Sequence, residues 1–534
     1  MEAMQHFERL CQAMADPALY PHPVSCLERR DTHISAVFLT GPWVYKLKKP
    51  VDFGFLDFRT LDARRHFCHQ EVILNQRLSR GVYEGVVPIR EDPQGRISLG
   101  GDGKTVEYAV KMKQLQDDDN LHMLLQKGLV HPEEMERLGR HLAEFYDRCD
   151  RNVTIDHFGH TEVIAINMEE NFRQIEPYVD DVIQREPWEF IRQASRAFFE
   201  NWADLFSGRV REGRIRDGHG DLRAEHIYFS DGIQIIDCIE FNDRFRYGDV
   251  VCDLAFLYMD MENLGHPEMS RIFLAAYAKE ANDPGLYALL DFYAAYRAVV
   301  KLKVACLGLP SRGERSEKHA AALKQADAYL NLAYRYAIRF SRPTLWVFCG
   351  LPATGKSSLA LQVSKALEIA VFQSDRIRKE EGVEHLPKAE VVPFAQGAYR
   401  PELRQRIYAK MLFRAQEELK KGHSVILDAS YSHRKWREDV KQLAADLDTN
   451  VLFIECTCSE ETMRERLKGR ESRPGLSDAR LQHLPEMVAS FEPLEEAPPE
   501  SLIQVRTEAP FFETFMSVLS KAYELKCLQV NNIL

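Results

Sequence analysis

The stretch Thr344-Leu-Trp-Val-Phe-Cys-Gly-Leu-Pro-Ala-Thr-Gly-Lys-Ser357 decides the fold of the last third of the chain. Its first six residues are β-branched or apolar and predict a buried strand. The rest fits Gly-x-x-x-x-Gly-Lys-Ser, a loop that turns its backbone N–H groups and the start of the next helix toward phosphate oxygens. We therefore expect a phosphate-binding loop between a strand and a helix.

The residue types in this loop indicate that it binds ATP and Mg²⁺. Lys356 is expected to neutralise the β- and γ-phosphates, and the Ser357 hydroxyl to bind the metal. The residues expected to contact the nucleotide are Gly350, Leu351, Pro352, Ala353, Thr354, Gly355, Lys356, Ser357 and Ser358. Residues 425–428 predict another buried strand, and its last residue, Asp428, is expected to hold the metal. The alternative for Asp428 is a cap at the start of the next helix.

Strand and helix signals alternate from residue 344 onward. We expect strands at 344–349, 370–374, 424–428 and 450–456, and helices at 356–367, 402–421, 434–446 and 460–469. This alternation predicts a parallel α/β sheet with helices on both faces. Ser341-Arg342-Pro343 interrupts the helical pattern just before the first strand, so we expect two domains, 1–340 and 344–534.

The first 340 residues predict a two-lobed α+β domain. Residues 36–39 and 43–48 are expected to form a hairpin through Thr40-Gly41-Pro42, followed by a helix at 61–78. From about residue 120 the pattern is mainly helical, with helices expected at 132–148, 188–206 and 320–339 and a loop and strand segment at 216–240.

Composition and charge narrow the function classes. The net charge of −11 makes nucleic acid an unlikely partner, and the N-terminus lacks the features of a secretory signal. No apolar run is long enough to span a membrane, so a cytoplasmic location is expected. The 11 cysteines are expected to be free thiols. Cys456 and Cys458 alternate along an expected strand, which favours burial over metal binding.

The C-terminal motifs resemble small P-loop kinases of the polynucleotide-kinase and zeta-toxin type over about 344–500. In those enzymes an acidic residue after the second strand receives the proton of the acceptor hydroxyl. The segment 373–378, Gln-Ser-Asp-Arg-Ile-Arg, is similar to that element and implies Asp375 as the base. The segment 464–478 is similar to the arginine-bearing lid, which implies that Arg470 and Arg473 close over the transferred phosphate. Solvated helix arginines are the alternative.

A second resemblance covers roughly 30–300. His219-Gly220-Asp221-Leu222, then His226, then Ile235-Ile236-Asp237 resemble the catalytic segment of aminoglycoside phosphotransferases and the wider kinase-like fold. The resemblance implies Asp221 as the base and Asp237 as a Mg²⁺ ligand, with Asp253 bracing the loop.

Upstream, Lys46 on an expected strand and Glu71 on the following helix fit the ion pair that positions ATP phosphates in kinases. Lys48 and Lys49 are rival candidates. His226 departs from the family, which has a metal-binding asparagine there, because an imidazole is a poor ligand for Mg²⁺. Weak ATP binding, a site with one metal, and a binding scaffold all remain open, and His226 itself is either a metal ligand or a buried, hydrogen-bonded histidine.

Together these patterns predict an ATP-dependent phosphotransferase that acts on a hydroxyl of a small-molecule or nucleotide acceptor. One alternative is an ATPase-driven regulator or toxin-like module whose N-terminal domain only binds ligand. Another is a nucleic-acid end-processing kinase, against which the acidic net charge counts. The sequence names neither the acceptor nor the oligomeric state, because substrate pockets are built from variable loops and helices.

Overall fold

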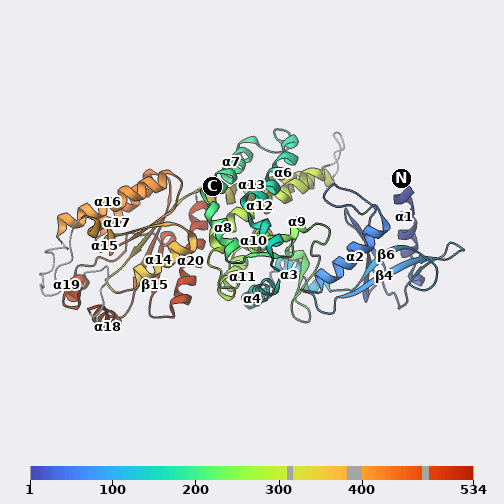
Figure 1. Cartoon of the computed structure of the whole chain (residues 1–534), viewed down its shortest axis with the longest axis horizontal. Coiled ribbons are helices and arrows are strands. Elements are labelled where there is room, and N and C mark those ends of the chain that lie inside the picture. Colours follow the sequence, from blue (N-terminus) through green and yellow to red (C-terminus); the bar gives the residue numbers. More distant parts are fainter. Residues whose placement is uncertain (1, 310–316, 382–399, 472–479, 533–534) are drawn as a thin grey trace. The chain divides into compact units, whose positions relative to one another are not determined.

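The computed structural model describes residues 2–309, 317–381, 400–471 and 480–532 (Figure 1). The chain forms two compact units, one of Met1–Asn167 with Phe206–Ala281 and the other of Met168–Leu205 with Asn282–Leu534. The second unit thus includes helices that precede the boundary expected at 341–343. That boundary stays a prediction.

A six-stranded antiparallel sheet forms one part of the first unit. Its strands, in spatial order, are β1 (Glu28–Asp31), β2 (Ser35–Leu39), β3 (Trp43–Lys48), β6 (Lys104–Lys113), β4 (Tyr83–Glu91) and β5 (Ile97–Leu99). The expected hairpin of β2 and β3 is confirmed. Side chains alternate along β3, so Tyr45 and Leu47 pack toward α1 (Glu2–Met14), while Val44 packs toward α2 (Leu61–Asn75). Lys46 and Lys48 share the α2 face with Val44.

The rest of the first unit is mainly helical. Its helices are α3 (Leu121–Lys127), α4 (Pro132–Arg148), α5 (Val153–Asp156), α9 (Asp243–Arg246), α10 (Val250–Asn263) and α11 (Pro267–Glu280). Two short antiparallel pairs frame the 219–240 segment: β7 (Ile215–Asp217) and β10 (Tyr247–Asp249) flank it in the sequence, and β8 (Ile227–Tyr228) and β9 (Gln234–Ile235) lie within it. Along the chain, α6 (Thr161–Ile175) and α8 (Ala203–Arg211) connect this unit to the other.

The second unit contains a five-stranded parallel sheet, which confirms the expected fold class. Its strands, in spatial order, are β12 (Ala370–Gln373), β13 (Val425–Asp428), β11 (Thr344–Cys349), β14 (Asn450–Thr457) and β15 (Leu502–Arg506). Its helices are α7 (Arg185–Asn201), α12 (Leu286–Leu307), α13 (Glu317–Ser341), α14 (Lys356–Leu367), α15 (Ser374–Glu380), α16 (Pro401–Lys420), α17 (Arg434–Asp446), α18 (Glu460–Glu471), α19 (Leu484–Ala489) and α20 (Phe511–Asn531).

Helices cover both faces of this sheet. Apolar residues of α16 and α17 form one core with Leu345, Val347 and Leu427. The next residues along each strand point to the opposite face, where α14 and α20 contact the sheet. Within the described ranges, no helix combines the length and apolar character that crossing a membrane requires.

Candidate functional site

The loop between β11 and α14 has a backbone that is strained at several positions. Gly350, Ala353 and Gly355 adopt positive φ angles of 128°, 65° and 89°. A Cβ atom on Gly350 would lie 2.4 Å from the Cys456 carbonyl oxygen, so only glycine fits there. Ala353 holds a left-handed conformation without being glycine, which is a strain that the surroundings must support.

Arg466 of α18 and Thr507, directly after β15, support this strained loop. The Arg466 guanidinium donates to the Ala353 carbonyl at 3.1 Å, to the Thr507 hydroxyl at 3.0 Å and to the Thr507 carbonyl at 2.7 Å. The Thr507 hydroxyl in turn donates to the Thr354 carbonyl at 2.6 Å. Sequence reasoning missed both residues, because no local pattern links them to a loop that lies more than 100 residues earlier.

Asp428 offers a buried carboxylate oxygen to a cation. It lies at the end of β13 with 2% exposure, and Gln373 donates to its Oδ2 at 2.9 Å. Its Oδ1 is buried and has no hydrogen-bond partner among the described residues. Burial raises the pKa of Asp428, while the charge of Lys356 and the side chains of Gln373 and Ser357 lower it by less. An unpartnered oxygen of this kind beside Ser357 fits Mg²⁺.

The alternative role for Asp428, as a helix cap, is wrong, because α17 begins at Arg434 with His433 at its N-cap position. Among the side chains that the structure describes, no three histidines, cysteines or carboxylates gather in a way that would hold a metal ion. Mg²⁺ is compatible with so few protein ligands, since it usually keeps several waters and binds substrate phosphates.

Asp375 lies in the first turn of α15, beyond the end of β12, and accepts a hydrogen bond from Arg378 at 2.8 Å. Its side chain is 31% exposed, so it is open to an acceptor. Arg473 lies outside the described residues. The backbone of Arg470 belongs to α18, and its side chain is outside the description.

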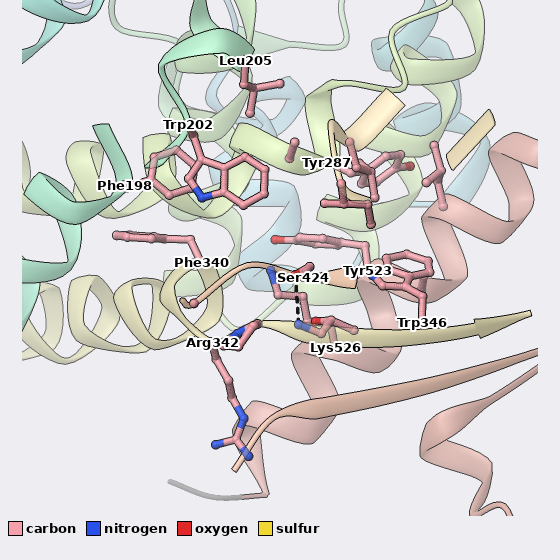
Figure 2. Close-up of a pocket in the computed structure, with 18 residues that line it drawn as sticks. Phe198, Trp202, Leu205, Tyr287, Phe340, Arg342, Trp346, Ser424, Tyr523 and Lys526 are labelled. Carbon is pink, nitrogen blue, oxygen red and sulfur yellow. Dashed lines mark hydrogen bonds between the residues drawn. The ribbon is translucent and has the colours of Figure 1, made fainter. Parts of the chain in front are cut away.

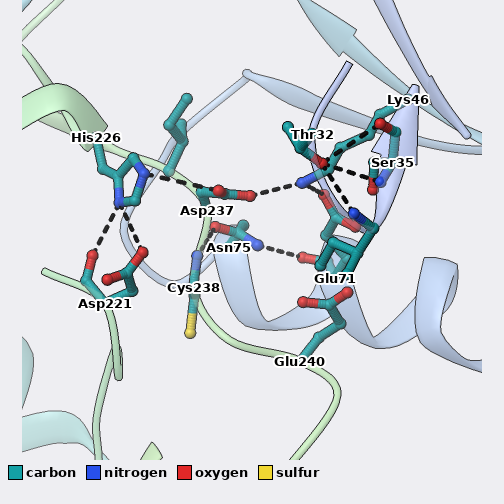
Figure 3. Close-up of polar contacts among 12 residues, drawn as sticks. Thr32, Ser35, Lys46, Glu71, Asn75, Asp221, His226, Asp237, Cys238 and Glu240 are labelled. Carbon is teal, nitrogen blue, oxygen red and sulfur yellow. Dashed lines mark hydrogen bonds and ion pairs between the residues drawn. The ribbon is translucent and has the colours of Figure 1, made fainter. Parts of the chain in front are cut away.

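The first unit contains the second group of predicted residues, and Figure 3 shows how they meet. The Lys46 ammonium lies 2.9 Å from Glu71 and 2.6 Å from Asp237. Burial lowers the pKa of Lys46, but Asp237 and Glu71 outweigh it and hold that pKa well above its usual range. Burial raises the pKa of Asp237, but Lys46 and His226 outweigh burial, so the pKa of Asp237 lies below its usual value. The side chain of Asp237 is nearly half exposed, so solvent screens part of this effect.

The rival lysines differ in their surroundings. Lys48 is almost fully buried and pairs with Glu71 at 2.6 Å and with Glu240, which sequence reasoning missed. Lys49 pairs with Asp31 at 3.0 Å, away from Glu71. The half-exposed Asp237 therefore pairs with Lys46, whereas Lys48 lies deeper in the protein than Lys46.

Asp221 is held by a residue that the sequence analysis did not single out. Arg223 donates to both carboxylate oxygens of Asp221, each at 3.0 Å. Burial raises the pKa of Asp221, but Arg223 and His226 outweigh it and lower the pKa to about 2. His226 Nδ1 lies 2.8 Å from the Asp221 carbonyl, and its Nε2 lies 3.7 Å from Asp237. The imidazole thus contacts both predicted acidic residues and is hydrogen-bonded within the protein.

Asp253 braces the loop, as the sequence analysis expects. It accepts hydrogen bonds from the backbone N–H groups of His219 at 2.7 Å and Gly220 at 2.9 Å. Gly220 has a φ of 87°, which favours glycine.

A separate pocket lies in the second unit, near the start of β11 (Figure 2). Its aromatic lining residues are Phe198, Trp202, Tyr287, Phe340, Trp346 and Tyr523. Its volume of about 80 Å³ is roughly half that of a cavity known to hold benzene. Its two cationic lining residues are paired, Lys526 with Asp291 at 3.5 Å and Arg342 with Asp448 at 2.7 Å.

Two known families match parts of this chain. The family described as "Phosphotransferase enzyme family" matches residues 122–293, and the family described as "AAA domain" matches residues 345–494. An uncharacterized protein of Mycobacterium tuberculosis (strain H37Rv) is 33% identical over 462 residues, which cover 86% of this chain and 89% of that protein.

Two solved structures are also similar to parts of the chain. A gluconokinase from Sinorhizobium meliloti 1021 is 16% identical with a TM-score of 0.28, covering 36% of this chain and 95% of its own. A spectinomycin phosphotransferase in complex with ADP and spectinomycin is 12% identical with a TM-score of 0.35, and the match covers 62% of this chain and 98% of that protein. Both TM-scores are low, so the fold assignment rests on the sheet topology and the matched families. Those families support phosphotransferase activity in general.

Proposed function

Because the chain belongs to the same family as the Mycobacterium tuberculosis protein, and joins a phosphotransferase-family domain to a P-loop domain, we propose that it is an ATP-dependent phosphotransferase. It moves the γ-phosphoryl group of ATP to a hydroxyl of a small-molecule or nucleotide acceptor, and it acts in the cytoplasm. Residues 1–340 and 344–534 are its functional domains.

The observation that carries this proposal is the buried carboxylate of Asp428 beside the strained P-loop. Its Oδ1 lacks a hydrogen-bond partner within the described part of the protein, and Lys356 and Ser357 both lower the pKa of this carboxyl group. Such a group is costly to bury unless a ligand satisfies it. Mg²⁺ and a nucleotide together would do so, because Asp428 and Ser357 would hold the metal and Lys356 would neutralise the phosphate charge.

In this proposal each of the named residues of the second unit has a separate role in catalysis. Ser357 and Asp428 hold Mg²⁺, which neutralises phosphate charge when bound. Lys356 and the loop N–H groups hold the β- and γ-phosphates. Asp375 takes the proton of the acceptor hydroxyl while the oxygen of that hydroxyl forms a bond to the γ-phosphorus of ATP. The bond between the γ-phosphorus and the oxygen that bridges it to the β-phosphate breaks at the same time, and ADP is released. Arg470 and Arg473 are proposed to close over the transferred group.

The first unit is proposed as a second nucleotide site. Lys46, positioned by Glu71, binds phosphates, Asp237 binds one metal ion, and Asp221 faces the acceptor. His226 is hydrogen-bonded to the Asp221 carbonyl, which supports a structural role over a metal ligand. This arrangement supports a site with one metal ion.

The test is a screen of hydroxyl-bearing metabolites with Mg²⁺ and ATP, in which we expect acceptor-dependent ADP release and a mass gain of one phosphoryl group. Lys356→Ala should reduce turnover by about 100-fold or more, because the transition-state charge then lacks its cation. Lys365→Ala is the matched control, since Lys365 is exposed in the last turn of the same helix. ADP release that no acceptor stimulates would contradict the proposal and favour an ATPase-driven regulator.

A further inference from the structure

Five charged side chains of the first unit form one continuous chain of ion pairs. Asp237 pairs with Lys46 at 2.6 Å, Lys46 with Glu71 at 2.9 Å, Glu71 with Lys48 at 2.6 Å, and Lys48 with Glu240. The charges alternate in sign along the whole chain. The middle and far end are buried: Glu71, Lys48 and Glu240 are 0%, 1% and 8% exposed.

Glu71 divides its two oxygens between the two lysines. Its Oε1 faces Lys46, and its Oε2 accepts a hydrogen bond from Lys48. A buried ammonium needs full compensation, because it has lost its water. Glu240 supplies a second carboxylate to Lys48, and this leaves Oε1 of Glu71 to Lys46. Without Glu240, Lys48 would depend on Glu71 alone and draw it away from Lys46.

Glu240 also anchors the segment that carries Asp237. Asp237 has a φ of 65°, a conformation that a residue other than glycine keeps only when its surroundings support it. The segment is tied to β3 at both ends, through Asp237 to Lys46 and through Glu240 to Lys48. Between them, Asn75 of α2 accepts a hydrogen bond from the Cys238 N–H at 2.9 Å (Figure 3).

We propose that Glu240 is a positioning residue of the first-unit site, and that it fixes the Lys46 ammonium and the Asp237 carboxylate through Lys48 and Glu71. This inference rests on the proposed nucleotide binding by that site. The two lysines then have different roles: Lys46 binds the nucleotide, and Lys48 links Glu240 to Glu71 and so keeps Glu71 in place beside Lys46.

A matched control exists in the same unit. Glu107 of β6 pairs with Arg64 of α2 at 2.8 Å, and both side chains are as buried as those of the Lys48 and Glu240 pair. Among the described residues, Glu107 forms no hydrogen bond or ion pair with Lys46 and pairs with Arg64 instead. Glu107→Gln therefore removes one buried carboxylate charge outside the proposed chain.

The experiment uses the full chain with Lys356→Ala, which silences the P-loop, and measures ADP binding with Mg²⁺ by calorimetry together with thermal unfolding. Glu240→Gln and Glu107→Gln should lower the unfolding temperature to a similar extent. Only Glu240→Gln should weaken ADP binding, by about tenfold, because small displacements of binding groups have effects of this size or larger. Glu240→Asp, which keeps the charge, should recover part of the affinity.

Equal ADP affinity in the Glu240→Gln and Glu107→Gln proteins would overturn this inference and leave the proposed function intact. An absence of ADP binding in the Lys356→Ala parent would instead refute nucleotide binding by the first unit, and the inference with it. If Glu240→Gln does not fold, the double variant Lys48→Met/Glu240→Leu replaces it, since removing both charges avoids an unpaired buried ion. Unchanged affinity in the double variant would also overturn the inference.

Discussion

At the scale of single residues, His219 shows how burial fixes a protonation state next to Asp221. The imidazole is fully buried; the Asp221 N–H donates to its Nδ1 at 3.2 Å, and its Nε2 lies 3.0 Å from the Ile236 carbonyl. A ring that accepts at Nδ1 and donates from Nε2 is neutral. Burial lowers the pKa of His219 to about 4. The loop that carries Asp221 is therefore built on an uncharged histidine.

We expect acid to destabilise the first unit through His219. The unfolded chain protonates this residue near pH 6.5 and the folded protein only near pH 4, so its stabilisation is complete above pH 6.5 and is lost as the pH falls toward 4. The loss is about 3 kcal/mol over this range. Denaturant unfolding at several pH values should show a shallower pH dependence for His219→Gln than for the natural chain. Identical slopes in the two proteins would contradict this assignment.

The sequence predicted one contact of the candidate site, the ion pair of Lys46 with Glu71, and the structure contains it. The ion pair of Lys46 with Asp237 was not predicted. The sequence alone could not show which of Lys46 and Lys48 contacts the nucleotide, because both lie on the same face of one strand. Glu240 and Arg223 were missed, since a carboxylate or guanidinium near a motif is usually solvated and only the contacts show otherwise.

At the scale of elements, the P-loop depends on a helix that is far away in the sequence. Arg466 reaches from α18 to the carbonyl of Ala353, the strained residue in the loop. Thr507 connects the same guanidinium to Thr354. These contacts fix the carbonyls of Ala353 and Thr354, so α18 braces the loop that we propose to bind the nucleotide.

Arg466→Ala should weaken binding of the nucleotide to the P-loop by about 1–3 kcal/mol, because charge-assisted hydrogen bonds to Ala353 and Thr507 are lost. Arg464→Ala is the control: Arg464 lies on the same helix, is half exposed and pairs with Glu460 one turn away. Calorimetry with Mg²⁺ and ADP on the Asp237→Ala chain, which silences the first unit, compares the two. A loss that is the same for both variants would assign the effect to α18 as a whole.

Helices and strands were predicted correctly where the hydrophobic pattern extended over many residues and where turn-forming residues ended it. The strand at 344–349 and the helices at 356–367 and 434–446 have the expected bounds. The helix expected at 188–206 ends at Asn201, and α8 starts after Trp202, a break that no glycine or proline marks. β15 and α20, which follow the last predicted helix, were not predicted.

At the scale of the whole molecule, the two constellations belong to different compact units, and the relative from Mycobacterium tuberculosis aligns over both. The two proposed sites predict two bound nucleotides per chain. Calorimetry with Mg²⁺ and ADP should give a stoichiometry of about two for the natural chain, about one for Lys356→Ala or Asp237→Ala, and none for the double variant, because each change removes a charge that nucleotide binding requires. If the natural chain binds only one nucleotide, and Lys356→Ala alone abolishes it, the first unit is a scaffold, and its chain of ion pairs serves folding.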